Sequence, residues 1–267
     1  MIPQKSSRRL RRFFSPHIFS KEGEEVCLHK SETHHLQRVL RLRPGDACLV
    51  TDGMGHEARA FVLKIDRGEA VVKLEKLLSK NEAFSKDDGV QVFVALALPQ
   101  RGKMDFLVEK LQELGVAGIF LMETERTMIK MSAENKTKAV ARWEKISRES
   151  AKQSGSLRLM TIEAPRPYTK ILEQLQAHDE NALFDPLPDT IPFAPWFLEC
   201  KERFAQKKIP TPLRANLLFG PEGGFSEREL ELARQRQDLS IVSLGARVLK
   251  LDTAVLAVSS IFRLMLS

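Results

Sequence analysis

The sequence predicts an α/β protein in which a mostly parallel sheet, covered by helices on both faces, follows a smaller β-rich domain. The first 80 residues hold several short β-prone runs separated by turn signals. Beyond a polar run at 79–89, apolar strand-like runs alternate with runs of helical period, as in parallel α/β folds. The first of them, 90–98, is almost continuously apolar, which is typical of a strand buried on both faces.

The first domain is expected to be a small closed barrel with one helix. Turn signals lie at residues 44–46, 52–53 and 67–68, and Ser31 can cap a helix that carries Leu36, Val39 and Leu40 at helical spacing. We interpret residues 1–14, which hold four arginines and no acidic residue, as a basic arm. The expected strands are 25–28, 47–52, 57–65 and 70–77.

The second domain repeats strand and helix to the end of the chain. We therefore divide the chain into a domain at 1–80, a linker at 81–89 and a second domain at 90–267. The expected helices are 104–114, 134–153, 169–177 and 195–206, and the expected strands after the first are 119–122, 159–162, 182–184, 216–219 and 241–244.

Composition restricts the function classes. Lysine and arginine number 42 against 35 acidic residues, a net charge of +7 that favours a polyanionic partner such as nucleic acid. No apolar run approaches the roughly 20 residues that span a membrane, so we expect no membrane partner. The three cysteines are scattered without metal-ligand spacing, so no metal site is expected and a reducing cytosol fits better than an oxidising compartment.

A glycine-rich loop follows the expected strand at 216–219. It reads Gly220-Pro221-Glu222-Gly223-Gly224-Phe225-Ser226, and Ser226 with Glu229 forms a capping box for the next helix. Glycines allow positive φ and let a ligand approach the main chain, and the carboxyl end of a parallel strand is where α/β proteins place ligands. The phosphate-binding glycine patterns are absent, which disfavours a nucleoside triphosphate or a dinucleotide. The alternative is a tight turn without a ligand.

A second loop, residues 245–254, follows the last expected strand and leads into a largely apolar final helix with Asp252 or Thr253 as its cap. Two glycine-bearing strand ends close in sequence predict one pocket lined by main chain. Such a pocket suits an adenine and an apolar methionine chain better than it suits phosphates.

Charged residues surround these loops and the first domain. Glu125 and Arg126 follow the strand at 119–122, and Arg247, Lys250 and Asp252 lie in the last loop, although each of them could be an ordinary solvated charge. Arg38, Arg41 and Arg43 join the N-terminal arginines on the first domain, where we favour a phosphate-contacting surface over a merely solubilising one.

The two loops, LFGPEGGFS at 218–226 and LGARVLKLDTA at 244–254, resemble the C-terminal signatures of the 16S ribosomal RNA (uracil-1498-N3) methyltransferases, the RsmE family of the SPOUT superfamily. Further matches are Arg12-Phe13-Phe14, HHLQRVLRLRPGD at 34–46, KMDFLVEKLQELGV at 103–116, Glu125-Arg126 and ESAKQ at 149–153. The resemblance runs from about residue 12 to the end of the chain.

The resemblance implies a PUA-like RNA-binding β-barrel at 1–80 and a SPOUT domain with a deep trefoil knot at 90–267. It implies S-adenosylmethionine as cofactor, 16S rRNA of the small ribosomal subunit as substrate, within the 30S subunit, a homodimer whose active site takes residues from both subunits, and a cytoplasmic location. The implied cofactor-binding residues are Leu218, Phe219, Gly220, Glu222, Gly223, Gly224, Leu244, Gly245, Val248, Leu249, Thr253 and Ala254. The residues expected to bind RNA are Arg8, Arg9, Arg11, Arg38, Arg41, Arg43, Lys103, Arg247 and Lys250.

Methylation of uridine N3 requires loss of the N3 proton, so a cation near O2 or O4 and a proton acceptor near N3 are needed. We expect Arg126 or Arg12 to supply the positive charge and Asp252 or Glu125 to orient it or accept the proton, with Thr253 anchoring the pocket. Lys250 and Asp252 stand where the family has Arg and Glu, and Ser156 precedes Arg158 where an Arg is common, which weakens these assignments.

Two alternative functions stay open at this point. One is a SPOUT methyltransferase with another target, a ribose 2′-O or a tRNA base. The other is a non-catalytic RNA-binding assembly protein.

Overall fold

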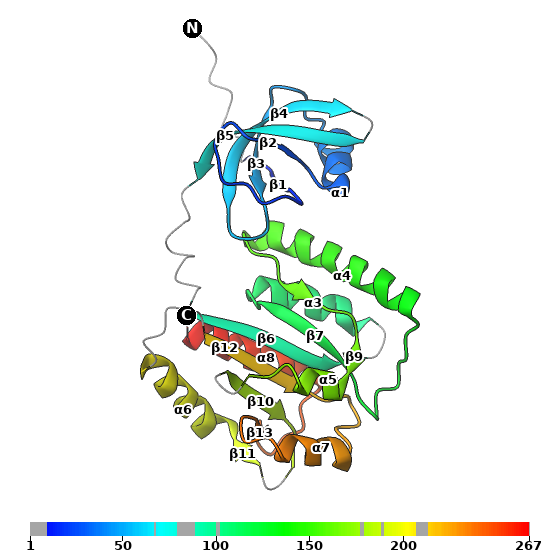
Figure 1. The fold of residues 1–267 in the computed structure, drawn as a ribbon, viewed down its shortest axis with the longest axis vertical. Coiled ribbons are helices and arrows are strands. Elements are labelled where there is room, and N and C mark those ends of the chain that lie inside the picture. Colours follow the sequence, from blue (N-terminus) through cyan, green and yellow to red (C-terminus); the bar gives the residue numbers. More distant parts are fainter. Residues whose placement is uncertain are drawn as a thin grey trace. The chain divides into compact units, whose positions relative to one another are not determined.

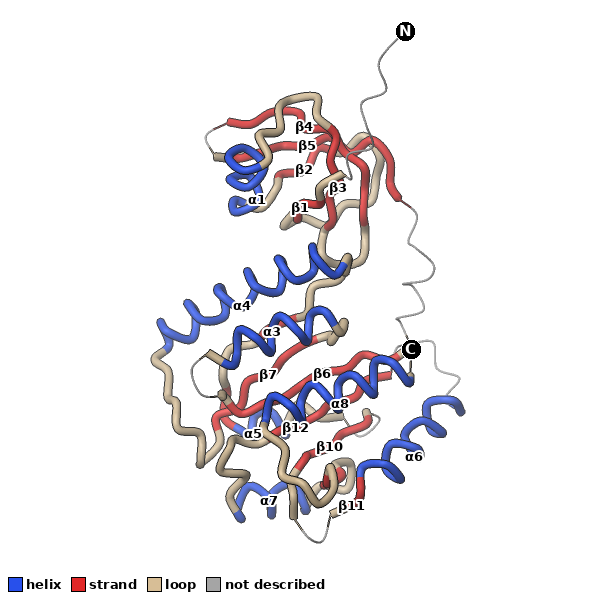
Figure 2. The backbone as a smooth tube through the Cα atoms, turned by 180° about the vertical axis from the view of Figure 1, so that it is seen from behind, coloured by secondary structure: helices blue, strands red, loops and turns tan. Residues whose placement is uncertain are grey.

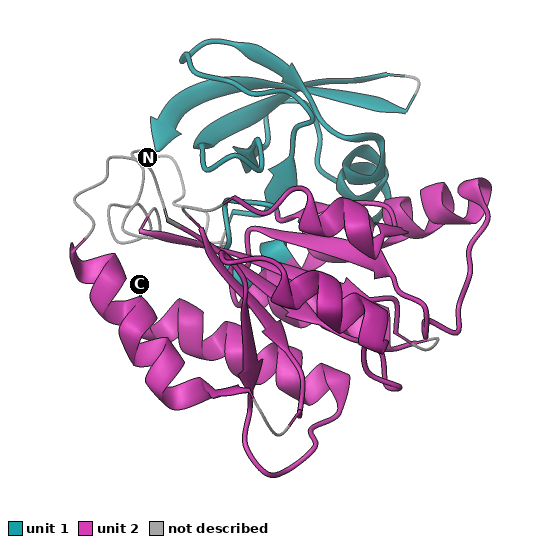
Figure 3. Ribbon diagram, turned by 60° about the horizontal axis from the view of Figure 1, so that its bottom comes forward, with its two compact units in different colours: residues 1–85, 151–159 teal, residues 86–150, 160–267 magenta. Residues whose placement is uncertain are grey.

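The structure, a computed structural model, describes residues 10–66, 68–78, 89–99, 102–176, 179–187, 190–206 and 213–266. The chain forms two compact units, Met1–Ser85 with Ala151–Leu159, and Lys86–Ser150 with Met160–Ser267 (Figure 3). The expected linker at 81–89 lies outside the described residues except for Gly89. Within the described ranges, no helix is long and apolar enough to cross a membrane.

The first unit is built on a five-stranded sheet with the order β1-β3-β4-β5-β2. β1 runs parallel to β3, and the other neighbouring pairs are antiparallel. Its core includes Phe13, Leu36, Val50 and Val72, all fully buried. The strands are β1 (Arg12–Phe14), β2 (Glu25–Cys27), β3 (Ala47–Thr51), β4 (Glu57–Asp66) and β5 (Glu69–Leu78).

Two local expectations for this unit are wrong. The end of the expected basic arm is strand β1, because Phe13 and Phe14 are buried and pair in register with Val50 and Thr51. The helix α1 (Lys30–His34) is capped by His29, whose imidazole accepts the N–H of Ser31, rather than by Ser31 itself. It continues into a π-helical turn, η1 (His35–Val39).

Residues 151–159, which the sequence analysis placed in the second domain, belong to the first unit. The N–H of Leu159 donates to the carbonyl of Gly53 at 2.9 Å, and Gly55 donates to Leu157 at 3.0 Å. Lys152 forms an ion pair of 2.7 Å with Glu32, whose side chain is only 1% exposed. The segment therefore extends the turn between β3 and β4 and adds a cation to the core of the unit.

The second unit contains a fully parallel sheet, which confirms the predicted α/β fold. Its strand order is β11-β13-β10-β12-β6-β7-β8, and β9 also pairs with β7 (Figure 1). The strands are β6 (Val90–Ala97), β7 (Gly118–Glu123), β8 (Thr161–Ile162), β9 (Arg166–Pro167), β10 (Glu180–Phe184), β11 (Ile191–Pro192), β12 (Leu213–Phe219) and β13 (Ser240–Ser243).

Helices cover both faces of this sheet, as the alternation of patterns predicted. On one face, α3 (Lys103–Glu113), α6 (Phe193–Gln206) and α8 (Leu251–Met265) pack against the strands (Figure 2). Trp143 of α4 (Ala133–Ser154) belongs to the same core cluster. On the other face lie α5 (Tyr168–Leu172) and α7 (Glu227–Arg234). The capping box of Ser226 and Glu229 at the start of α7 is confirmed.

The parallel register brings three strand ends to one edge of the sheet. Phe184 at the end of β10 pairs with Phe219 at the end of β12 and with Val242 of β13. The final helix begins beside this edge, with Lys250 rather than Asp252 or Thr253 as its N-cap residue. The loops that follow β10, β12 and β13 can therefore enclose a common space.

Candidate functional site

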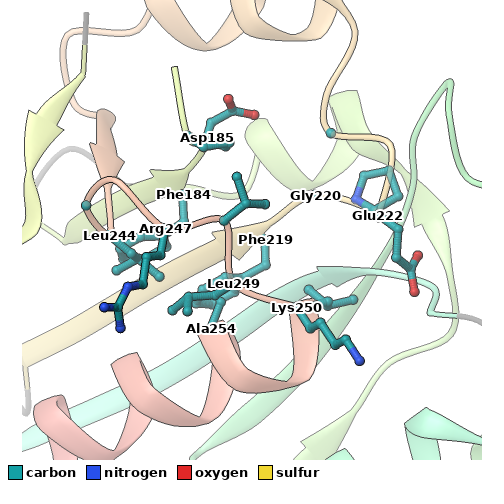
Figure 4. A pocket seen from close by; sticks show the side chains of 16 residues that line it. Phe184, Asp185, Phe219, Gly220, Glu222, Leu244, Arg247, Leu249, Lys250 and Ala254 are labelled. Carbon is teal, nitrogen blue, oxygen red and sulfur yellow. The ribbon is translucent and has the colours of Figure 1, made fainter. Parts of the chain in front are cut away.

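A pocket of about 300 Å³ lies at this edge of the sheet (Figure 4). Its wall consists of the three loops after β10, β12 and β13 and the first turn of α8. The lining residues are Phe184, Asp185, Pro186, Phe219, Gly220, Pro221, Glu222, Gly224, Leu244, Gly245, Arg247, Val248, Leu249, Lys250, Leu251 and Ala254. The pocket predicted from the two glycine loops is therefore present, and a third loop contributes to it.

The pocket has an apolar floor and charged groups in its wall. Phe219 and Leu251 are buried, and Ala254 of α8 lies with Phe219 at the centre of the view in Figure 4. The charged residues of the wall are Asp185, Glu222, Arg247 and Lys250. Such a mixture of an apolar surface and a few polar groups is typical of a small-molecule site.

Two contacts within the glycine loop, a hydrogen bond and a packing contact, determine its conformation. The N–H of Gly224 donates to the carbonyl of Pro221 at 2.8 Å, and Gly224 has a positive φ of 69°. Gly220 has no positive φ; it must be small because a Cβ there would lie 2.9 Å from the ring of Phe225. Positive φ is thus required at Gly224, whereas Gly220 makes room for an aromatic ring.

The buried carboxylate of Glu229 holds this loop to the turn after β7. Its Oε2 accepts the N–H of Ser226 at 2.8 Å, as in an ordinary capping box. Its Oε1 accepts the N–H of Glu125 at 2.9 Å. Because Glu125 and Arg126 belong to the turn at residues 124–127, the predicted ionisable pair lies beside the glycine loop.

Arg126 and Lys103 contact the glycine loop directly. Nη1 of Arg126 donates to the carbonyl of Gly223 at 2.9 Å, and Nζ of Lys103 lies 3.1 Å from Oε1 of Glu222. The side chain of Glu125 is exposed, with an oxygen 3.9 Å from Nη1 of Arg228. Two cations from other strand ends therefore border the loop.

Asp185 is a site residue that the sequence analysis missed. It follows β10, lines the pocket and is only 8% exposed. Burial raises the pKa of its carboxyl above the ordinary value, against hydrogen bonds from the backbone N–H groups of Phe225 and Leu187 that lower it. The signal that could have found it is the expected strand at 182–184, whose carboxyl end must lie at the same edge as those of its parallel neighbours.

Comparison with known proteins identifies the family. Residues 86–263 match the model of the RNA methyltransferase domain, and residues 28–75 match that of the RNA methyltransferase PUA domain. The ribosomal RNA small subunit methyltransferase E of Synechocystis sp. is 32% identical over 229 residues, which cover 86% of this chain and 69% of that protein. The chain belongs to the ribosomal RNA small subunit methyltransferase E family.

Other members of this family agree with that assignment. The enzyme of the same name from Bacillus subtilis is 25% identical and covers 89% of this chain, which in turn covers 86% of it. The crystal structure of the family member from Neisseria gonorrhoeae, bound to S-adenosyl methionine, shares the fold with a TM-score of 0.76 at 23% identity, over 96% of this chain and 98% of that one. The family predicted from the signature loops is therefore confirmed.

Most of the residues that the family implies for the cofactor lie on the pocket wall. They are Phe219, Gly220, Glu222, Gly224, Leu244, Gly245, Val248, Leu249 and Ala254. Leu218, Gly223 and Thr253 are not among the lining residues: Leu218 packs on the opposite face of the sheet, Gly223 receives the bond from Arg126, and Thr253 is exposed. Arg247 and Lys250, expected to contact RNA in this family, line the same pocket.

The remaining predicted catalytic and RNA-binding residues do not gather at one place. Asp252 lies in the first turn of α8 beside the pocket wall, and its Oδ1 is buried with no hydrogen-bond partner in the described part of the chain. Arg12 belongs to the first unit, where its Nε lies 2.6 Å from Glu57. The expected RNA-binding arginines of that unit, Arg11, Arg38, Arg41 and Arg43, are all exposed, and Arg8 and Arg9 lie outside the described residues.

Proposed function

We propose that this protein transfers a methyl group from S-adenosylmethionine to N3 of a specific uridine in the 16S rRNA of the small ribosomal subunit. Family membership supports the reaction class, a methyl transfer to ribosomal RNA. The observation that carries the proposal for this chain is the pocket at the strand ends, which both signature loops line.

The residues present fit the methyl donor. A volume of about 300 Å³ lies at the lower end of the range for small-molecule sites. Phe219, Leu249 and Ala254 offer apolar surface, while the backbone of Gly245, which has open space where a Cβ would lie, can approach a ligand. We assign the cofactor-binding role to the lining residues of the two glycine loops and the first turn of α8. Bound there, S-adenosylmethionine would supply an electrophilic methyl group.

The acceptor nitrogen of uridine must lose its proton, and the resulting negative charge must be stabilised. Arg126 is suited to stabilise it. One N–H of its guanidinium is bonded to the carbonyl of Gly223, and its other N–H donors have no hydrogen-bond partner among the described residues, so they can reach a substrate oxygen. Arg12 is the second candidate for this cation.

Asp252 and Glu125 are the candidates that orient this cation or accept the N3 proton. Asp252 follows the lining residue Leu251, and its buried Oδ1 has no hydrogen-bond partner among the described residues, which supports a role as an acceptor. Lys250 and Asp252 keep the charges of the Arg and Glu that the family has at these positions, although Lys lacks the bidentate fork of Arg.

We also propose the finer features that the family implies: a PUA-like barrel, a deep trefoil knot and a homodimer. Exposed apolar side chains on the last loop and on α8 support the dimer, because exposed apolar patches commonly mark protein interfaces. Val248 is 81% exposed, and Leu264 and Met265 are 76% and 52% exposed.

In the proposed complex the exposed arginines of the first unit, together with Lys103, Arg247 and Lys250, contact the phosphates of 16S rRNA in the 30S subunit. A ribosomal substrate assigns the protein to the cytoplasm. Arg8 and Arg9, outside the described residues, belong to the same proposal.

The experiment is methyl transfer from tritiated S-adenosylmethionine to 30S subunits from cells that lack the modification, followed by nucleoside analysis. The expected product is 3-methyluridine. A 2′-O-methylated nucleoside, or label in tRNA alone, would favour another target, and absence of donor binding in calorimetry would favour a non-catalytic RNA-binding protein. Single alanine variants of Arg12, Glu125, Arg126 and Asp252 then test the roles given above; unchanged turnover in all of them would refute these roles.

A further inference from the structure

Glu229 links two loops that are far apart in the sequence. Its side chain is 4% exposed, and its two oxygens accept N–H groups from different loops: Ser226 of the glycine loop at 2.8 Å and Glu125 of the turn after β7 at 2.9 Å. The hydroxyl of Tyr168 donates to the backbone carbonyl of Glu229 at 3.1 Å, a further contact to the first turn of α7. A residue that served only as a helix cap would need one oxygen.

The turn that donates the second hydrogen bond also has hydrogen bonds of its own. The N–H of Thr124 donates to Oγ1 of Thr127 at 3.1 Å, the N–H of Thr127 donates to the carbonyl of Thr124 at 3.1 Å, and the two hydroxyls are 2.7 Å apart. Both threonines are buried. A bond to the N–H of Glu125 therefore fixes the position of the whole turn, and with it the backbone of Arg126.

The contacts close a ring. Glu229 holds Glu125, the next residue Arg126 donates to Gly223 at 2.9 Å, and the loop from Gly223 leads to Ser226, which Glu229 also holds. Arg126 is thus tied to the glycine loop in two ways. Its guanidinium donates to Gly223, and the backbone of the preceding residue, Glu125, donates to Glu229.

We propose that Glu229 is a positioning residue for methyl transfer: it couples the turn that carries Arg126 to the glycine loop, so that the cation stays aligned with the bound donor. The proposal rests on the function proposed above. A misplacement of about 1 Å at a reacting group can lower a rate by about a hundredfold.

Glutamine at position 229 separates the coupling from the helix cap. Gln can take the place of Glu in a capping box, so its amide oxygen can still accept the N–H of Ser226. Its NH2 group cannot accept a hydrogen bond, so the one amide oxygen serves either Ser226 or Glu125 and the link between the two loops is broken. The matched control is Glu227→Gln, which removes the same charge from the first turn of the same helix, where Glu227 pairs with Arg234 on the surface.

The test is a double-mutant cycle of Glu229→Gln and Arg126→Ala. Single-turnover methyl transfer to unmodified 30S subunits, the donor Kd by calorimetry and the thermal midpoint are measured for each variant. We expect Glu229→Gln to lower the rate by about tenfold, less than the loss for a full ångström, with the donor Kd close to wild type. The midpoint should fall only by the cost of one lost hydrogen bond. The double variant should be no slower than Arg126→Ala alone, because two residues that act as one unit are not additive.

Four results would overturn the proposal: a Glu229→Gln variant as fast as wild type, rate losses that multiply in the double variant, an equal loss in Glu227→Gln, or an Arg126→Ala variant as fast as wild type. A wild-type protein that transfers no methyl group would instead refute the proposed function, and the coupling with it. The two failures are therefore distinguished by the wild-type reaction.

Discussion

The ring of Phe225 lies so close to Gly220 that a Cβ on Gly220 would be 2.9 Å from two ring carbons. Tyr168 backs this ring, with 5.5 Å between the two ring centroids. Phe225 itself is 3% exposed, so the ring has little room to move away. The contact with Phe225, inside the same loop, therefore requires a glycine at position 220.

Gly220→Ala should weaken donor binding, because the added methyl group pushes either the loop or Phe225 out of place. Overpacking of this kind costs about 1 to 3 kcal/mol of folding stability, and displacement of the loop from the donor raises the Kd. Calorimetry with S-adenosylmethionine measures the change, and the double variant with Phe225→Leu should recover part of it. Wild-type affinity in Gly220→Ala would contradict this account.

Asp185→Asn should change the pH dependence of stability. Burial raises the pKa of Asp185 in the folded protein above 3.8, so the folded state takes up a proton more readily than the unfolded state. This contribution to stability is present at low pH and is lost as the pH rises through the folded-state pKa. Asparagine does not titrate, so the variant lacks this contribution. The melting temperature of the variant minus that of wild type should therefore become more negative as the pH is lowered from neutrality towards 4. A difference that is the same at every pH would contradict the prediction.

Lys152→Met should destabilise the first unit. It removes the cation 2.7 Å from Glu32, whose carboxylate is almost fully buried, and breaking a buried ion pair costs about 3 kcal/mol or more. Urea unfolding followed by circular dichroism measures the loss. Lys145→Met, on the exposed surface of the same helix, is the control and should stay within about 0.5 kcal/mol of wild type. Equal shifts in the two variants would argue against a special role for the pair.

Replacing Arg38, Arg41 and Arg43 with alanine should weaken binding to 30S subunits and reduce its salt dependence. If each arginine contacts a phosphate, the slope of log K against log salt should fall by about 2 to 3. The control removes three exposed cations from β4 and β5 instead, Arg59, Lys73 and Lys76. An unchanged slope in the first variant would place the RNA-binding surface elsewhere.

Much of the second unit could be predicted from the sequence because its signals are local. An apolar run such as residues 90–98 must be buried on both faces, and helical period separates the helices from the strands. The capping box needs only Ser226 and Glu229, which are three residues apart, so it is visible in the sequence and present in the structure. The two glycine loops likewise predicted the pocket, because each follows a strand.

Other features depended on contacts that no local pattern contains. Leu218 was expected at the cofactor, but side chains alternate along a strand, and in β12 Leu217 and Phe219 face one side while Leu218 packs on the other. The basic arm ends in strand β1 because Phe13 and Phe14 find partners in β3, more than 30 residues away. A charge-rich segment gives no local sign of such a pairing.

The sequence by itself therefore determined the fold class, the family and the position of the ligand pocket, since these depend on periodicity and on glycines at strand ends. The tertiary structure decided which residues act together there. Asp185 joins the pocket only because β10 lies beside β12, and Glu229 reaches Glu125 across 104 positions of sequence because α7 returns to the turn after β7. Hydrogen bonds and packing depend on distance in space, and the folded chain alone sets that distance.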